Sequence, residues 1–223
     1  NYDLRNNELQ TLLSTISHDL KSPIVTASSF IGFLEEDLKA GNSEKVEDSL
    51  TRIKGALQRM QTLTSDIIEL NKYGKIKPKM QWIDSRRIIE KCISQLSFEF
   101  QRKKASVKVL GNFPSIYADI KSIERVFENL LNNAIKYGGD DKGLLIEIKC
   151  ELSNGKSVFS VANNGPEIDP EYFEKIFEPF HQLQANQEGS GIGLAIVARI
   201  MESHQGRVWV ESSYQWTKFY LEF

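Results

Sequence analysis

Apolar residues recur at helical spacing over the first 70 positions, and this repeat limits the folds open to the chain. A spacing of three or four residues predicts one continuous apolar stripe on a long helix from Leu4 to Ala40. The stripe consists of Leu9, Leu12, Leu13, Ile16, Leu20, Ile24, Ala27, Ile31, Leu34 and Leu38. A second run is close to a heptad repeat, which favours a helix in a bundle. Its members are Val46, Leu50, Ile53, Leu57, Met60, Leu63, Ile67 and Leu70.

Two such helices cannot shield both stripes from water by themselves. Gly41 is suited to end the first helix and Ser43 to begin the second, which predicts an antiparallel hairpin. Two hairpins paired into a four-helix bundle would bury both stripes, so we expect a homodimer through residues 1–72. The alternative is a monomer whose hairpin packs on the rest of the same chain. Because the repeat is already under way at Leu4, we expect the chain to be a fragment that lacks an upstream part.

The pattern changes after residue 70. Residues 71–79 are polar and contain Gly74 and Pro78, which predicts a linker between domains 1–75 and 76–223. Beyond it, short strands and interspersed helices favour an α+β chain that ends in a two-layer α/β sandwich. The expected helices are 84–103, 120–137 and 192–203, and the expected strands are 80–83, 107–110, 115–118, 144–152, 158–162, 207–212 and 217–223.

Composition excludes several classes of protein. With 40% hydrophobic and 26% charged residues, the chain is globular rather than disordered. A net charge of −2 without a dominant basic cluster argues against nucleic acid as a partner. No apolar run approaches membrane-spanning length, and we expect a cytoplasmic fragment, whether or not the full-length protein is anchored in a membrane. Cys92 and Cys150 are expected to be buried, unpaired thiols.

A histidine lies beside a carboxylate inside the first predicted helix. His18 is two residues from both Ile16 and Leu20, so at helical pitch it points away from the apolar stripe. An exposed imidazole next to Asp19 suits nucleophilic or acid–base chemistry. Alone this motif is weak, because most exposed helical histidines have no chemical role.

Glycines precede the last predicted helix, in the segment 189–194 (GSGIGL). Glycine lets main-chain N–H groups approach phosphate oxygens, and a helix N-terminus adds partial positive charge. The segment matches neither the dinucleotide fingerprint nor the P-loop, and a flexible turn is the alternative.

Two asparagine clusters complete the set of motifs. Asn129, Asn133 and Lys136 share one face of the predicted 120–137 helix, where amide oxygens suit a hydrated cation and lysine suits a phosphate. Asn163, at a strand end, is able to bond both an amino group and a ring nitrogen of a base. The alternatives are a solvated polar face and an ordinary Asn-Gly turn.

In this order, the four motifs resemble those of the catalytic core of bacterial sensor histidine kinases. Residues 10–75 are similar to the dimerisation and phosphoacceptor domain, with 17–24 as its H box. Residues 80–223 resemble the ATP-binding domain of the gyrase, heat-shock chaperone, histidine kinase and MutL superfamily. The N, G1, F and G2 boxes of that domain correspond to residues 128–137, 163–168, 173–180 and 189–194.

The resemblance implies that His18 accepts the γ-phosphoryl group of ATP while Asp19 holds the other ring nitrogen. It implies a phosphatase role for Ser22, and Mg²⁺ bound by Asn133. The other implied nucleotide-site residues are Asn129, Lys136, Tyr137, Asn163, Gly165, Ile168, Phe180, Gly189, Gly191, Gly193 and Leu194. The implied partners are a second copy of the chain, the receiver domain of a response regulator that takes the phosphoryl group on an aspartate, and an upstream sensor module absent from this chain.

Several residues depart from the family pattern. Asn163 stands where the family has Asp, Glu167 replaces a later glycine of the G1 box, and residues 214–216 (YQW) occupy a turn expected to be rich in glycine. The lid, residues 181–188, carries neither Lys nor Arg. We therefore predict weak ATP affinity.

Two other functions compete with that of a kinase. The departures favour a catalytically weak dimeric scaffold that binds a response regulator. An ATP-hydrolysing clamp is disfavoured, because Asn129 stands where gyrase-type domains place the glutamate that activates water, and Glu128 is rotated about 100° from it on a helix.

Overall fold

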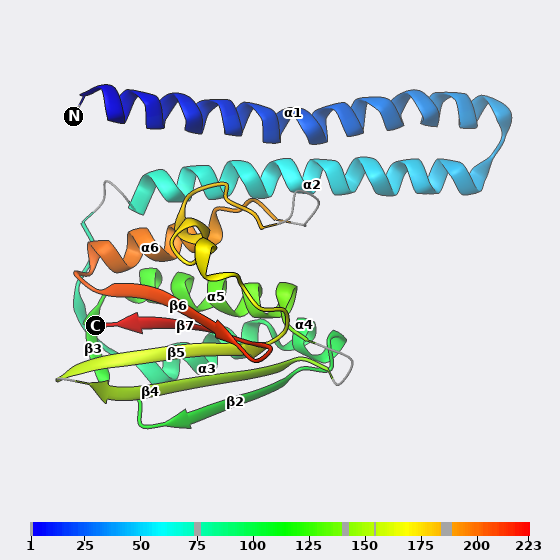
Figure 1. The fold of residues 1–223 in the computed structure, drawn as a ribbon. Helices are drawn as coiled ribbons and strands as arrows, with labels where there is room; N and C mark the ends of the chain where they lie inside the picture. The colour runs from blue at the N-terminus through cyan, green and yellow to red at the C-terminus, as the bar shows by residue number, and fades with distance from the viewer. Residues whose placement is uncertain (1, 74–76, 140–142, 154, 184–188) are drawn as a thin grey trace. The chain divides into compact units, whose positions relative to one another are not determined.

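The computed structural model describes residues 2–73, 77–139, 143–153, 155–183 and 189–223, with side chains from Ile16 onward. It contains two compact units (Figure 1). One holds the two N-terminal helices up to Glu69 together with residues 189–191, and the other comprises Leu70–Leu183 and Ile192–Phe223.

Helices α1 (Tyr2–Ala40) and α2 (Ser43–Tyr73) form the predicted antiparallel hairpin (Figure 1). Gly41 between them has a φ of +72°, the left-handed conformation that glycine adopts without strain at a helix end. Pro23 lies inside α1 without ending it. Helix α2 continues to Tyr73, so the segment predicted as a linker begins as helix.

Helix α2 has a buried stripe, and a cation–π contact joins it to α1. Ser49, Ala56 and Leu63 recur every seven residues on α2 and are buried. The guanidinium of Arg52 on α2 lies 5.5 Å from the ring centroid of Phe30 on α1.

A large part of the predicted apolar stripe remains in water, because one hairpin has only one inner seam. The exposed large apolar side chains of the two helices are Ile24, Val25, Ile31, Phe33, Leu38, Leu50, Leu57 and Ile68. The predicted stripe side chains of Leu9, Leu12 and Leu13 lie outside the described residues.

Five strands of the second unit form a mixed sheet in the order β2-β4-β5-β7-β6. They are β2 (Ser106–Gly111), β4 (Leu145–Ser153), β5 (Lys156–Asn164), β6 (Arg207–Ser213) and β7 (Trp216–Glu222). Strand β2 runs parallel to β4, and the other neighbours are antiparallel. Strands β1 (Gln81–Asp84) and β3 (Ser115–Ala118) pair separately as a two-stranded sheet.

Three helices, α3 (Ser85–Gln95), α5 (Ile120–Tyr137) and α6 (Gly193–Ser203), cover one face of the five-stranded sheet (Figure 1). This confirms the predicted two-layer sandwich. The core lies between the layers, where the largest fully buried side chains are Phe127, Phe159, Phe219, Ile89, Ile123, Leu130, Leu131, Leu144, Ile146, Ile148, Ile192 and Ile196. Two short 3₁₀ turns, η1 (Pro170–Tyr172) and η2 (Lys175–Phe177), precede the lid segment.

The single helix predicted over residues 84–103 is wrong. The chain forms α3 and a separate short helix, α4 (Ser97–Arg102), with Leu96 between them at φ −95° and ψ 11°. Serines on either side of Leu96 are weak helix formers, and the change of direction allows Phe100 to be buried.

The start of α5 is held by two groups. Asp119 is the predicted N-cap, and its Oδ1 accepts from the N–H of Ser122 at 2.9 Å. The N–H of Asp119 donates to His204 Nε2 at 3.1 Å, while Nδ1 of that histidine lies 2.8 Å from the carbonyl oxygen of Ile200. His204 therefore ties the start of α5 to the end of α6, which is a structural role.

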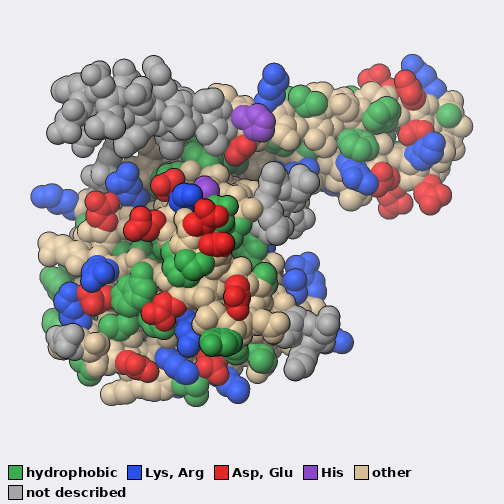
Figure 2. All heavy atoms as spheres, viewed as in Figure 1, with side chains coloured by type: hydrophobic (Ala, Val, Ile, Leu, Met, Phe, Trp, Pro, Cys, Tyr) green, Lys and Arg blue, Asp and Glu red, His purple; other side chains and the backbone are tan. Residues whose placement is uncertain are grey.

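Charges are mixed over the surface. On the face shown in Figure 2, basic and acidic side chains alternate without an extended area of one sign. In the part of the chain that the structure describes, no helix is both long enough and apolar enough to cross a membrane. Burial raises the pKa of the Cys92 thiol to about 12 and that of Cys150 to about 11, so both thiols stay protonated, as their predicted burial requires.

Candidate functional site

His18 lies on the exposed face of α1. Its side chain is 84% exposed, and Nδ1 lies 3.2 Å from Asp19 Oδ1. The contact fixes which ring nitrogen faces the carboxylate and leaves Nε2 directed to solvent. Ser22, one turn later, is also exposed. The hairpin therefore presents an accessible imidazole whose second nitrogen faces an acid.

Helix α5 divides into an apolar and a polar face as predicted. Val126, Leu130, Leu131 and Ala134 are buried in the core. On the other face, the side chains of Asn129, Asn133 and Lys136 are half-buried, so they border solvent without projecting fully into it. Such a position suits groups that hold a ligand at the edge of a domain.

Asn129 lies against the start of α6. A Cβ added at Gly193 would lie 3.0 Å from Asn129 Oδ1, so glycine permits this close approach. The Nδ2 of Asn129 is buried and has no hydrogen-bond partner among the described residues. Because a buried donor without a partner is costly, this atom fits a site completed by an acceptor such as a phosphate oxygen.

Glu128 is directed away from that face. Its carboxylate lies 3.8 Å from the guanidinium of Arg125, and its charge contributes to the raised pKa of the Cys92 thiol on α3, after burial as the larger cause. A carboxylate on this side of the helix is poorly placed to activate a water beside Asn129 and Asn133.

Lys136 and Tyr137 form a pair at the end of α5. The Lys136 ammonium donates to the hydroxyl of Tyr137 and lies 4.3 Å from the centroid of its ring. The tyrosine therefore holds the lysine charge close to the helix C-terminus, which is favourable for a cation.

Asn163 lies at the end of β5 with only 5% of its surface exposed. Its Nδ2 donates to the main-chain carbonyl of Asn164 at 3.0 Å. An aspartate could not make this bond, which gives a physical reason for the amide at this position. The remaining carbonyl, Oδ1, is an acceptor suited to an amino group of a base.

Sequence reasoning missed Gly138 and Asn164. A Cβ at Gly138 would lie 2.5 Å from the carbonyl oxygen of Ala134 and 2.9 Å from Asn163 Nδ2, so only glycine fits between the two motifs. Asn164 bonds Leu145 N and Gly143 O, which joins β5 to the start of β4. In the sequence, only the Gly-Gly pair after the helix pointed to a special role for Gly138. Only the Asn-Gly turn pointed to Asn164.

The G1 segment contacts the turn between β6 and β7. Gly165 N donates to the carbonyl of Gln215 at 2.8 Å, and Ile168 N donates to Ser212 Oγ at 2.9 Å. Glu167, which replaces a later glycine of the G1 box, accepts a hydrogen bond from Gln215 N at 3.1 Å.

The remaining candidates lie in the F and G2 boxes. Phe180 is half-buried with a φ of +66°, and Leu194 is half-buried in the first turn of α6. Gly189 and Gly191 have φ of +129° and +67°, conformations that glycine adopts readily. Of the predicted lid, residues 184–188 lie outside the described residues.

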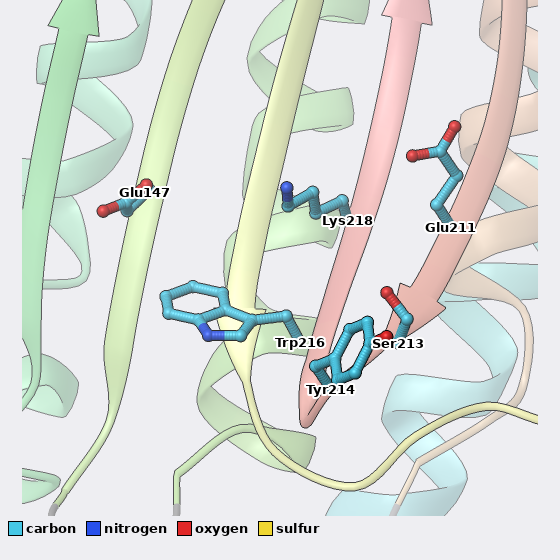
Figure 3. A pocket seen from close by; sticks show the side chains of 6 residues that line it. All are labelled: Glu147, Glu211, Ser213, Tyr214, Trp216 and Lys218. Atoms are coloured by element: carbon cyan, nitrogen blue, oxygen red, sulfur yellow. The ribbon is translucent and has the colours of Figure 1, made fainter.

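A shallow pocket of about 240 Å³ lies on the side of the sheet away from the helices (Figure 3). It is lined by Glu147, Glu211, Ser213, Tyr214, Trp216 and Lys218. None of these is a predicted site residue. The described residues also contain no group of three or more His, Cys, Asp or Glu side chains arranged to hold a metal, so a cation at the N box would depend on amide and ligand oxygens.

Two family models match the chain in the order that the motifs suggested. Residues 8–75 match the His Kinase A (phospho-acceptor) domain, and residues 118–223 match the histidine kinase-, DNA gyrase B- and HSP90-like ATPase. The chain belongs to the sensor histidine kinase family. Its fold class, a helical hairpin followed by an ATPase-type sandwich, is that of a histidine kinase catalytic core.

Curated relatives of this histidine kinase core are longer proteins. The methanogenesis regulatory histidine kinase FilI of Methanothrix harundinacea is 36% identical over 94% of this chain and 24% of its own length. The phytochrome-like protein Cph1 of Synechocystis is 33% identical over 96% of this chain and 28% of its own length. The chain therefore spans about a quarter of these relatives.

Solved histidine kinases share the fold. The Acinetobacter baumannii histidine kinase AdeS aligns with a TM-score of 0.71 at 19% identity, over 92% of this chain and 96% of that one. Histidine kinase ThkA, solved in complex with response regulator protein TrrA, aligns with a TM-score of 0.82 at 24% identity, over 99% of this chain and 63% of that one. At these sequence identities, the structural similarity establishes that this chain shares the fold of those proteins.

Proposed function

We propose that this histidine kinase core transfers the γ-phosphoryl group of ATP to His18 and from there to an aspartate of a response regulator. The observation that carries the proposal is the exposed imidazole of His18 with Asp19 Oδ1 3.2 Å from Nδ1. An imidazole held in this way has one nitrogen free to act as a nucleophile.

In the first step, the lone pair of His18 Nε2 attacks the γ-phosphorus, and the bond from that phosphorus to the bridging oxygen of ADP breaks. ADP leaves with the electron pair of the broken bond. Asp19 stabilises the positive charge that develops on the ring through the proton on Nδ1. In the second step, a carboxylate oxygen of the regulator attacks the same phosphorus, and the electron pair of the P–N bond returns to Nε2.

The nucleotide would be held by the N, G1 and G2 boxes. Asn129 Nδ2 supplies a buried donor for a phosphate oxygen, Lys136 supplies a positive charge, and Asn163 Oδ1 accepts from the adenine amino group. Asn133 would be the protein ligand of Mg²⁺, which neutralises phosphate charge when bound. Gly165, Ile168, Tyr137, Phe180, Gly189, Gly191, Gly193 and Leu194 would surround the nucleotide.

We propose residues 1–75 as the dimerisation and phosphoacceptor domain and residues 76–223 as the ATP-binding domain. The exposed apolar side chains of α1 and α2 support a homodimer through residues 1–72, since a second hairpin would remove them from water. ThkA is described in complex with a response regulator, and we propose a receiver domain as the partner here. An upstream sensor module would supply the input.

Ser22 is proposed to serve the reverse activity, dephosphorylation of the regulator. It is exposed one turn after His18 on the same face, where its hydroxyl is able to orient a water molecule. A Ser22→Ala variant that removes phosphate from the regulator as fast as wild type would contradict this role.

The direct test of the kinase is incubation with γ-labelled ATP and Mg²⁺. Wild type should acquire a label that is lost in acid and kept in alkali, and His18→Ala should acquire none. Asp19→Asn should label at least about tenfold more slowly, because the imidazolium loses its charged partner. Equal labelling of His18→Ala and wild type would overturn the proposal.

A second function, a dimeric scaffold with little catalysis, is favoured by the departures at Asn163 and Glu167. Nucleotide binding separates the two. A folded dimer that binds the regulator but shows no binding of ATP at millimolar concentration would favour the scaffold. We expect binding with a dissociation constant no tighter than the low micromolar range.

A further inference from the structure

Two departures from the family pattern, Glu167 and the turn at Tyr214 and Gln215, are in contact with each other. The turn connects β6 to β7, with Ser213 opposite Trp216 in the strand register. Tyr214 and Gln215 have φ of +52° and +62°, so both central residues occupy the left-handed region in which asparagine and glycine are preferred. These conformations are strained for an ordinary residue, so contacts that support the turn offset strain.

Three hydrogen bonds supply that support from the G1 segment. Gly165 N donates to Gln215 O at 2.8 Å, Gln215 N donates to Glu167 Oε1 at 3.1 Å, and Ile168 N donates to Ser212 Oγ at 2.9 Å. The first two form a reciprocal pair around the main chain of Gln215. Only Glu167 and Ser212 contribute side chains to this set.

The other side of the G1 segment faces the nucleotide-site residues. A Cβ at Gly165 would lie 2.8 Å from the carbonyl oxygen of Tyr137 and 3.5 Å from Asn163 Nδ2. Gly165 is therefore packed between the end of α5 and the turn. Movement of the turn would shift Gly165 relative to Asn163 and Tyr137.

The side chains of the turn point elsewhere. Tyr214 and Trp216 lie on the outer face of the sheet, beside the pocket with Glu147 and Lys218 (Figure 3), and Tyr214 is 91% exposed. The turn therefore reaches the G1 segment through the main chain of Gln215 and not through its aromatic residues.

We propose that Glu167 is a positioning residue for nucleotide binding, which acts by holding the β6–β7 turn against the G1 segment. This inference rests on the proposed nucleotide site. Glu167 does not itself contact the nucleotide. Its carboxylate holds Gln215, whose carbonyl accepts from Gly165 N, at positions where the family pattern has a further glycine and a glycine-rich turn.

The direction in which two substitutions at Glu167 change nucleotide affinity distinguishes positioning from simple charge repulsion. If the negative charge of Glu167 only repelled phosphate, both Glu167→Ala and Glu167→Gln would bind nucleotide more tightly than wild type. If Glu167 positions the loop, Glu167→Ala should weaken ADP binding by about threefold to tenfold, the size expected for one exposed charge-assisted hydrogen bond. Glu167→Gln keeps an acceptor oxygen and should stay within about twofold of wild type.

The measurements are the dissociation constant of ADP by titration calorimetry and amide hydrogen exchange of the nucleotide-free full chain. Glu167→Ala should speed exchange at Gln215, Gly165 and Ile168, and Glu167→Gln should not. In the labelling assay, the apparent KM for ATP should rise while kcat changes little. Glu151→Ala is the matched control, because Glu151 is an exposed glutamate of the same domain outside this contact.

Ser212 provides an independent test of the same contact. Ser212→Ala removes the acceptor for Ile168 N, together with the contacts of the hydroxyl to Trp216 O and Thr217 Oγ1, whereas Ser212→Thr keeps a hydroxyl there. We expect the alanine variant to weaken ADP binding and the threonine variant to restore it.

Tighter binding by both Glu167 variants, or unchanged exchange at Gln215 in Glu167→Ala, would overturn the positioning role. A wild-type chain that binds no nucleotide would instead contradict the proposed function and, with it, a role of Glu167 in nucleotide binding. The exchange data then still report whether Glu167 holds the turn, so the two failures are distinguishable.

Discussion

Asn164 joins the end of β5 to the start of β4 through both atoms of its amide. Oδ1 accepts from Leu145 N at 2.7 Å, and Nδ2 donates to the carbonyl of Gly143 at 2.9 Å. Because only 5% of the surface of Asn164 is exposed, water cannot easily replace either hydrogen bond. The residue therefore stabilises the sheet next to the candidate adenine site, with both atoms of its amide bonded to the main chain.

We expect Asn164→Asp to lower the free energy of unfolding by about 2 kcal/mol at neutral pH, because a buried carboxylate cannot donate to Gly143. Burial would raise the pKa of the new carboxyl in the folded state. The loss should therefore be smaller below that pKa and grow as the pH rises through it. Urea unfolding followed by tryptophan fluorescence measures this, since all three tryptophans lie in residues 76–223. The same change at exposed Asn112 is the control and should have little effect.

Asp119 shows how one carboxylate links stability to pH. Burial opposes ionisation of its carboxylate, but hydrogen bonds from Ser122 N, Ser122 Oγ and Lys79 N outweigh burial and lower its pKa. A lowered folded-state pKa contributes stability above the unfolded pKa of about 3.9, and that contribution is lost as the pH falls through the folded value.

We expect Asp119→Asn to cost about 1 kcal/mol at neutral pH, since asparagine still caps α5 but lacks both the charge that favours a helix N-terminus and the second oxygen that accepts from Lys79 N. The cost should shrink as the pH falls below about 4, because wild-type Asp119 then becomes neutral as well. Unfolding free energies measured between about pH 3 and 7 test this. A difference that stays constant over that range would contradict the assigned role of the charge.

Among the elements, the β6–β7 hairpin combines strong pairing with an unfavourable turn. Tyr214 and Gln215 occupy left-handed conformations that cost an ordinary residue about 1 kcal/mol each. The main-chain bonds of Gln215 to Gly165 and Glu167 do not depend on its side chain. Mutation of these two side chains can therefore relieve the backbone strain without removing the main-chain hydrogen bonds of residue 215.

We expect the double variant Tyr214→Asn, Gln215→Gly to raise the free energy of unfolding by about 1 kcal/mol, because Asn-Gly is the preferred sequence for such a turn. Nucleotide affinity should stay within about twofold, since the main chain of residue 215 keeps its N–H and carbonyl. Thermal unfolding with ADP titration measures both. A less stable variant would show that Tyr214 contributes more than its exposure suggests.

At the scale of the whole molecule, the exposed apolar stripe of the hairpin is the surface that favours pairing with a second copy of the chain. Ile24, Ile31 and Leu38 on α1 are between 47% and 61% exposed although the periodicity predicts them on the apolar face. Each such side chain contributes about 1.5–3 kcal/mol when fully buried, which is the driving force for pairing two copies.

We expect Ile31→Lys to raise the dissociation constant of the dimer at least tenfold, as measured by sedimentation equilibrium. A lysine at the centre of the four-helix bundle would bury an unpaired charge. Ser28→Lys, on an exposed position of the same helix, should leave the dimer unchanged. Monomeric wild type, or equal dimerisation of Ile31→Lys, would contradict the predicted interface.

Most elements and the site motifs could be predicted from the sequence, because they depend on local patterns. The period of 3–4 residues locates α1 and α2, and Asp84 and Asp119 mark two helix starts through the caps that they form. The strands were placed within two residues at each end. The break at Leu96 was missed, because the serines on either side of it only weaken the helix and the break also depends on the burial of Phe100.

By itself, the sequence determined the hairpin, the exposure of His18, the two faces of α5 and the family, since each follows from periodicity or from residue types in a fixed order. The tertiary structure alone decided the strand order β2-β4-β5-β7-β6, the close approach of Gly138 to Asn163, and the contact of Glu167 with Gln215. These join residues that lie far apart in the sequence, such as Val158 with Glu222 and Glu167 with Gln215. Which distant groups meet depends on packing of the whole sandwich, and no local pattern carries that information.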